Sequence, residues 1–68
     1  MIKFEIDIDT VSVEVLLDSD GVDELVNYFH FIKEKKESMH LTVGNELNGE
    51  YSQNGNKIIN HVKLIFIE

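Results

Sequence analysis

The chain has 68 residues, with 13 acidic and 6 basic side chains and a formal net charge of −7 at pH 7. That length is enough for a single domain, residues 1–68, and the negative charge argues against binding to the phosphate backbone of DNA or RNA. The sequence has no cysteine and no apolar run long enough to span a bilayer, so we expect a cytoplasmic protein without disulfides or membrane contact.

Two strands are expected at the start of the chain. Every second residue from Ile2 to Ile8 is apolar, and the residues between them are polar or charged. A period of two is typical of a strand with one buried and one solvent-facing side. The same alternation continues over residues 11–15, so we expect a hairpin with a tight turn at Asp9-Thr10.

A helix is predicted from about residue 20 to about residue 36. The run 18–21, Asp-Ser-Asp-Gly, ends the second strand and offers Ser19 or Asp20 as the N-cap. Apolar residues then recur at helical spacing, at Val22, Leu25, Val26, Phe29 and Ile32. We expect this stripe to cover the apolar face of the sheet.

A third strand is expected at His40–Val43, and a polar stretch, residues 44–57, follows it. The stretch contains two turn signals, Asn48-Gly49 and Asn54-Gly55. It forms either one long loop or a small ribbon across Asn48-Gly49. Long loops in compact domains are often functional, so the stretch is a candidate contact surface; the alternative is a tolerated surface excursion.

The last predicted strand, residues 58–67, has apolar side chains on both faces. Val62, Leu64 and Phe66 can point to the helix, whereas Ile59, Ile65 and Ile67 point the other way. A strand that is apolar on both faces is usually covered on both. These three isoleucines therefore either contact a second copy of the chain, as a homodimer, or shelter under the 44–57 loop.

The predicted fold is thus α+β, a two-layer β-β-α-β-β arrangement with one helix packed on a four-stranded, mainly antiparallel sheet. The solvent-facing side of that sheet would carry Lys3, Glu5, Asp7, Ser12, Glu14, His40, Thr42, His61 and Lys63. The sequence has no metal-ligand motif, phosphate-binding loop, dinucleotide fingerprint or nucleophile elbow. We therefore expect no catalytic residue, no metal and no cofactor.

Two segments resemble a known family. They are the run from Val15 to Leu25, followed after the helix by His40-Leu41-Thr42, and the run from Asn56 to Leu64, which contains Ile-Asn-His-Val-Lys. Both are similar to the small immunity proteins of bacterial polymorphic toxin systems, in particular the immunity protein 32 family. The resemblance implies a short α+β protein, made beside a toxin gene, that binds and neutralises the toxin inside the producing cell.

The acidic composition agrees with such a role, because complementary charge speeds capture of a basic partner. The expected partner-binding residues are Glu5, Asp7, Asp9, Glu14, Glu46, Glu50, His61 and Lys63. Two alternatives remain open at this point. One is a structural homo-oligomer that uses Ile59, Ile65 and Ile67, and the other is a metal-binding protein that uses His40, His61 and nearby carboxylates.

Overall fold

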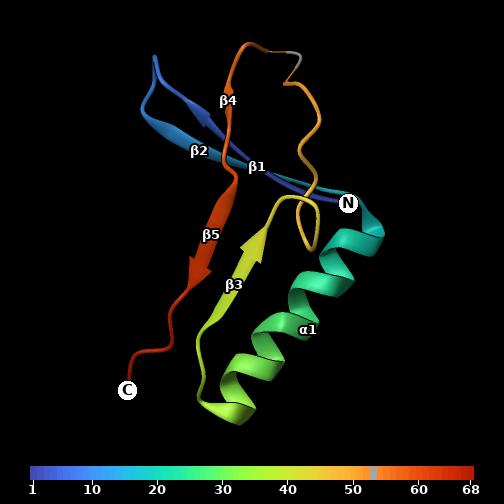
Figure 1. Cartoon of the computed structure of the whole chain (residues 1–68), viewed down its shortest axis with the longest axis vertical. Helices are drawn as coiled ribbons and strands as arrows, with labels where there is room; N and C mark the ends of the chain where they lie inside the picture. Colours follow the sequence, from blue (N-terminus) through green and yellow to red (C-terminus); the bar gives the residue numbers. More distant parts are fainter. Residues whose placement is uncertain (53) are drawn as a thin grey trace.

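A computed structural model describes residues 1–52 and 54–68, so Gln53, within the predicted 44–57 loop, lies outside the described residues. The elements are, in chain order, β1 (Ile2–Asp7), β2 (Ser12–Leu17), α1 (Ser19–Lys35), β3 (Met39–Thr42), β4 (Lys57–Ile58) and β5 (His61–Leu64). They form a three-stranded sheet of order β2-β1-β4 and a two-stranded sheet of β3 and β5, both antiparallel (Figure 1). The predicted α+β class is confirmed, but the single four-stranded sheet was wrong.

The sheets are separate because the predicted last strand is divided between them. The backbone N–H of Ile59 donates to the carbonyl of Phe4 at 2.9 Å, and the carbonyl of the next residue, Asn60, accepts from Val43 at 3.0 Å. The chain therefore passes from β1 to β3 within two residues. After Leu64 the strand ends, and Ile65 and Ile67 lie in an irregular segment with 65% and 86% exposure.

The hairpin of β1 and β2 is confirmed, with Phe4 opposite Val15 and Asp7 opposite Ser12. Its loop spans residues 8–11 and is wider than the predicted two-residue turn. The Asp7 carboxylate shapes this loop by accepting hydrogen bonds from the N–H groups of Asp9 and Thr10, at 3.0 and 3.3 Å. An aspartate that bonds to following backbone groups is a common way to begin a turn.

Helix α1 begins after Asp18, not after the predicted Ser19 or Asp20. The Asp18 carboxylate accepts hydrogen bonds from the N–H of Gly21, at 2.7 Å, and from the amino group of Met1, at 2.6 Å. The helix ends at Lys35, and the cap residue Lys36 has a left-handed backbone and donates its N–H to the carbonyl of Ile32 at 2.8 Å. Across the described ranges of the chain, no helix is long and apolar enough to cross a membrane.

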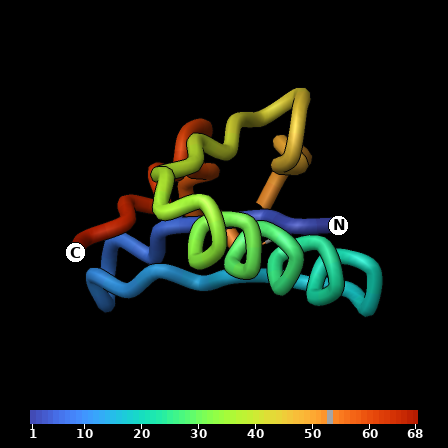
Figure 2. Tube along the Cα trace, turned by 90° about the horizontal axis from the view of Figure 1, so that it is seen from below, coloured from blue at the N-terminus to red at the C-terminus, as the bar shows by residue number. Residues whose placement is uncertain are grey.

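The core is small and lies between the two sheets and the helix. Ile2, Leu41 and Leu47 are buried, and the partly buried side chains around them are Phe4, Leu25, Tyr28, Met39, Val62 and Leu64. Helix α1 contacts β1 and β2 and lies alongside them in Figure 2. Only part of the predicted stripe faces the core, because Val22, Val26 and Phe29 remain 44%, 44% and 51% exposed.

Candidate functional site

The polar face of the hairpin brings two carboxylates together. Glu5 of β1 and Glu14 of β2 are directly opposite one another in the antiparallel register. Like charges in such a cross-strand pair destabilise a sheet unless a donor lies between them. Asn56 supplies that donor, since its amide nitrogen lies 3.2 Å from an oxygen of Glu5 and 3.0 Å from one of Glu14.

Glu5 is only 1% exposed, so its predicted place on an open partner-binding face was wrong. The ammonium of Lys3 lies 3.2 Å from one carboxylate oxygen, and the hydroxyl of Ser52 donates to the other at 3.2 Å. Burial alone would raise the pKa of Glu5, but hydrogen bonds from Lys3, Asn56 and Ser52 outweigh it and hold the pKa below its ordinary value. A buried carboxylate needs such partners, and these bonds connect β1 to the segment that contains Ser52 and Asn56.

The described residues of the predicted loop before β4, 44–52 and 54–56, contact the rest of the molecule at two points. Leu47 enters the core, and the N–H of Asn48 donates to the carbonyl of Ile2 at 2.8 Å. Further along, the Ser52 hydroxyl that donates to Glu5 also accepts from the N–H groups of Asn54 and Asn56, at 3.3 and 3.2 Å. The segment is therefore a structural cover for the polar face of the hairpin.

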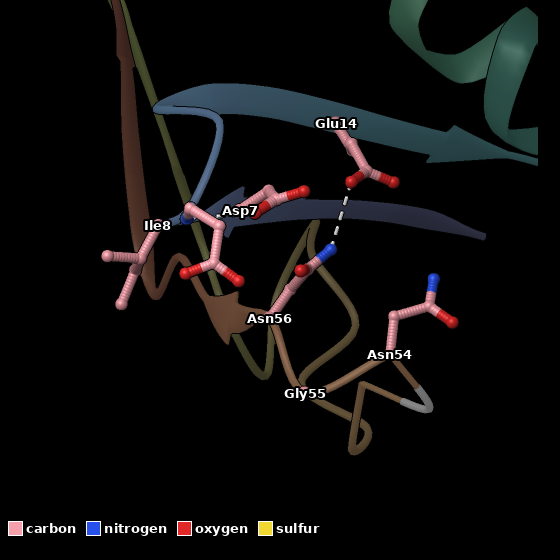
Figure 3. Close-up of a pocket in the computed structure, with 7 residues that line it drawn as sticks. Asp7, Ile8, Glu14, Asn54, Gly55 and Asn56 are labelled. Carbon is pink, nitrogen blue, oxygen red and sulfur yellow. Dashed lines mark hydrogen bonds between the residues drawn. The ribbon is translucent and has the colours of Figure 1, made fainter.

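An open cavity of about 460 Å³ lies beside the Asn56 bridge. Its lining residues are Asp7, Ile8, Asp9, Glu14, Asn54, Gly55 and Asn56, and we call it the acidic pocket. In Figure 3, Glu14 on β2 and Asn56 from the segment before β4 reach toward each other, with Asp7 on β1 nearby. Three carboxylates and two amides line the pocket, and none of its seven lining residues carries a positive charge.

The predicted partner-binding residues fall in several places. Asp7, Asp9 and Glu14 line the acidic pocket, and Glu50 lines a smaller neighbouring cavity of about 180 Å³ that also touches Lys3 and Glu5. The carboxylate of Glu46 accepts a hydrogen bond from the N–H of Thr42 at 3.0 Å and so stabilises the turn that follows β3. His61 and Lys63 belong to β5, in the other sheet.

The two histidines of the metal alternative do meet. Their ring nitrogens, Nε2 of His61 and Nδ1 of His40, lie 3.1 Å apart, and the ring centroids are 5.0 Å apart. Both rings are solvent-exposed, and the carboxylates of the hairpin belong to the other sheet. Within residues 1–52 and 54–68, no group of three or more His, Cys, Asp or Glu side chains is placed to hold a metal ion.

Ser52, Asn54 and Asn56 were missed in the sequence as site residues. The only signal was that Asn54-Gly55 favours a turn, and short polar side chains are common in any loop. Their importance comes from β4, which places the end of the segment beside Glu5 and Glu14. That pairing joins residues about 50 positions apart, so it cannot be predicted from a local sequence pattern.

Nothing among family models, curated proteins or solved structures matches this chain. Ionised carboxylates only accept hydrogen bonds, and the pocket is lined by three of them beside the polar side chains of Asn54 and Asn56. Such a set of acceptors suits a cationic group with several donors, such as an arginine or lysine side chain.

Proposed function

We propose that the chain is an immunity-type protein that binds a basic protein toxin and neutralises it by covering the surface the toxin needs. The acidic pocket is the centre of the contact and receives a basic side chain of the toxin. The observation that carries the proposal is the gathering of Asp7, Asp9 and Glu14 around one cavity, none of whose lining residues is a cation. The resemblance of the runs 15–25 and 56–64 to immunity proteins adds the toxin as partner.

Electrostatics supports a cationic occupant. Glu5 already has the ammonium of Lys3 beside it, so its charge is largely compensated within the fold. Asp7, Asp9 and Glu14 lie within one pocket, and charges closer than a Debye length of roughly 8 Å act together at physiological salt. A partner that supplies one or two cations would relieve their mutual repulsion, whereas an anionic partner would increase it.

The shape supports a side chain presented by another protein. The volume of about 460 Å³ is in the range of small-molecule sites, but the pocket is polar and open to solvent. A small apolar ligand would remain hydrated there and gain little. A protein partner can place one side chain in the pocket and cover the rim with its own surface, which excludes water and strengthens the charge pairs.

A peptide titration tests whether the pocket is the contact centre. The probe is a short arginine-rich peptide, and amide chemical shifts of the chain report where it binds. We expect the largest changes at Asp9, Gly55 and Asn56, and we expect them to shrink as salt is added.

Two variants that remove the same charge separate the pocket from the overall charge. The pocket variant carries Asp7→Asn, Asp9→Asn and Glu14→Gln, and the control carries Asp23→Asn, Glu24→Gln and Glu34→Gln on α1. The proposal predicts loss of binding in the pocket variant only. Equal weakening in both variants would mean that the peptide responds to net charge, and the pocket would lose its assigned role.

A further inference from the structure

Strand β2 forms an edge of its sheet, with no strand beyond it in the part of the chain that the structure describes. The hydrogen bond from the N–H of Asp18 to the carbonyl of Met1, at 3.3 Å, sets the phase of its ladder with β1. Bonded and non-bonded pairs alternate along an antiparallel ladder. Val13, Val15 and Leu17 therefore direct their N–H and C=O groups away from β1, toward the open edge.

The same three residues expose apolar side chains on the helix side of the sheet. Val13, Val15 and Leu17 are 60%, 44% and 37% exposed, on the face where Ile2 and Phe4 enter the core. An edge that offers both free backbone groups and an apolar face is suited to strand pairing.

Helix α1 extends this apolar surface. Its exposed stripe of Val22, Val26 and Phe29 lies about 100° further round the helix than the core-facing Leu25 and Tyr28. In Figure 1, α1 runs from upper right to lower left, and β1 and β3, the strands that carry the core residues Ile2 and Leu41, lie to its upper left. Right-handed winding then turns the stripe to the back of that view, the side on which β2 lies (Figure 2). We call the exposed faces of β2 and α1 the apolar corner.

Strand β2 lacks the features that usually keep an edge from pairing. Its sequence, Ser-Val-Glu-Val-Leu-Leu, has no lysine and no proline, and it is six residues long. Its one charged side chain, Glu14, is bonded to Asn56 on the opposite face of the sheet. The apolar corner therefore has no charge of its own along β2 to repel an incoming strand.

The surface of the isolated chain is larger than its mass predicts. The accessible area is 5044 Å², whereas a compact monomer of 7.9 kDa exposes about 4,400 Å². The radius of gyration, 12.7 Å, likewise exceeds the value of about 11 Å typical of 68 residues. The excess of roughly 600 Å² approaches the ~800 Å² that each partner contributes to a stable interface.

We propose that the apolar corner is an interface with a second copy of this chain, in which β2 pairs antiparallel with β2 of the partner subunit about Val15. This register places Val13 opposite Leu17 of the partner subunit and Val15 opposite Val15 of the partner subunit. Outward-facing backbone groups then meet one another, and both helices lie on the same face of a continuous six-stranded sheet.

Charge selects this register over its neighbours. Centred on Val15, the pairing places Glu14 opposite Leu16 of the partner subunit. A register centred on Glu14 places Glu14 opposite Glu14 of the partner subunit. A register centred on Leu16 places Glu14 opposite Asp18 of the partner subunit. Directly opposed like charges are destabilising, so of these three registers only the one about Val15 joins apolar pairs without repulsion.

This interface differs from the predicted homodimer through Ile59, Ile65 and Ile67, and it leaves the acidic pocket free. Glu14 points to the pocket face of the sheet, and Val13 and Val15 point to the helix face, because successive residues of a strand alternate in direction. A dimer joined at the apolar corner would thus present two acidic pockets on the face away from its helices.

Sedimentation velocity over micromolar to millimolar concentration tests the interface. We expect the apparent mass to rise from 7.9 kDa toward twice that value for the natural chain. Val15→Lys places two ammonium groups face to face and should weaken association at least ~10-fold, although it lowers the net negative charge. Ile65→Ser with Ile67→Ser, which removes apolar surface elsewhere, should leave association unchanged.

Hydrogen exchange of the natural chain gives a second readout that needs no variant. The amides of Val13, Val15 and Leu17 should exchange fast in dilute solution and become protected at high concentration. A monomer at every concentration would overturn the proposal. So would association that Ile65→Ser with Ile67→Ser abolishes, or protection that appears at other amides and not at these three.

Discussion

Leu47→Ala is the most informative change for the architecture of the candidate site. Leu47 is 3% exposed and belongs to the core with Ile2 and Leu41, although it lies in the irregular 44–57 stretch. Truncating a buried leucine to alanine removes apolar contacts and leaves a cavity, which costs about 2–5 kcal/mol. If the stretch were a tolerated surface excursion, the cost would stay within about 0.5 kcal/mol.

The expected loss is large relative to the total free energy of unfolding. At roughly 0.05–0.15 kcal/mol per residue, 68 residues have a total stability of about 3–10 kcal/mol. Leu47→Ala should therefore remove a large share of the free energy of unfolding. It should also loosen the segment that carries Ser52 and Asn56 to Glu5, because Leu47 anchors that segment to the core.

Urea unfolding followed by circular dichroism measures this cost, with Tyr51→Ala as the matched control. Tyr51 is in the same stretch but 95% exposed, so its truncation should change the free energy of unfolding by less than about 0.5 kcal/mol. Equal costs for Leu47→Ala and Tyr51→Ala would contradict a role for Leu47 in the core. A variant too unstable to show a folded baseline would agree with the upper end of the range.

Three further predictions follow from individual contacts. The folded pKa of Glu5 lies below its ordinary value of 4.5, so its ionised form stabilises the fold above that pH. This contribution is lost as pH falls through the folded pKa. The melting temperature of Glu5→Gln should therefore depend less on acid pH than that of the natural chain. Asn56→Asp places a third carboxylate between Glu5 and Glu14 and should lower Tm by more than ~4 °C, whereas Asn54→Asp, at an exposed position, should change it little. Gly21→Ala would ordinarily favour a helix by about 1 kcal/mol, but its Cβ would collide with the carbonyl oxygen of Met1. A variant more stable than the natural chain in urea would therefore contradict the close approach of α1 to Met1.

The hairpin and the helix could be predicted because each depends on a pattern of apolar residues within a short stretch of sequence. The alternation of residues 2–8 and 11–15 and the helical spacing from Val22 to Ile32 each lie within a short window. The boundary between β4 and β5 could not be found that way. The apolar pattern of residues 58–67 is continuous, and the break at Ile59 and Asn60 depends on hydrogen bonds to Phe4 and Val43.

The acidic site shows a similar limit. The polar positions of β1 correctly indicate the face away from the core, but they do not show whether another segment covers that face. Glu5 and Asp7 have the same place in the pattern, yet Glu5 is buried and Asp7 lines the pocket. The difference arises from Ser52 and Asn56, whose positions are set by pairing between distant parts of the chain.

The predicted core-facing stripe of the helix included residues that do not face the core, and the reason is geometric. One helix packed on a narrow sheet can bury about one side, and Leu25 and Tyr28 take the buried side here. Val22, Val26 and Phe29 are spaced correctly for a helix but are turned away from the core. A sequence pattern shows that a face is apolar, and only the assembled fold shows whether the same chain covers it.

The most direct test of the central claim is capture of the partner from cells of the source organism, with three baits compared in parallel by quantitative mass spectrometry. The baits are the natural chain, the pocket variant Asp7→Asn, Asp9→Asn, Glu14→Gln, and the helix variant Asp23→Asn, Glu24→Gln, Glu34→Gln. We expect the natural chain and the helix variant to capture one basic protein that the pocket variant does not. We also expect this protein, when expressed alone, to stop growth unless the natural chain is present. Recovery of the same proteins with all three baits would contradict a binding role for the acidic pocket.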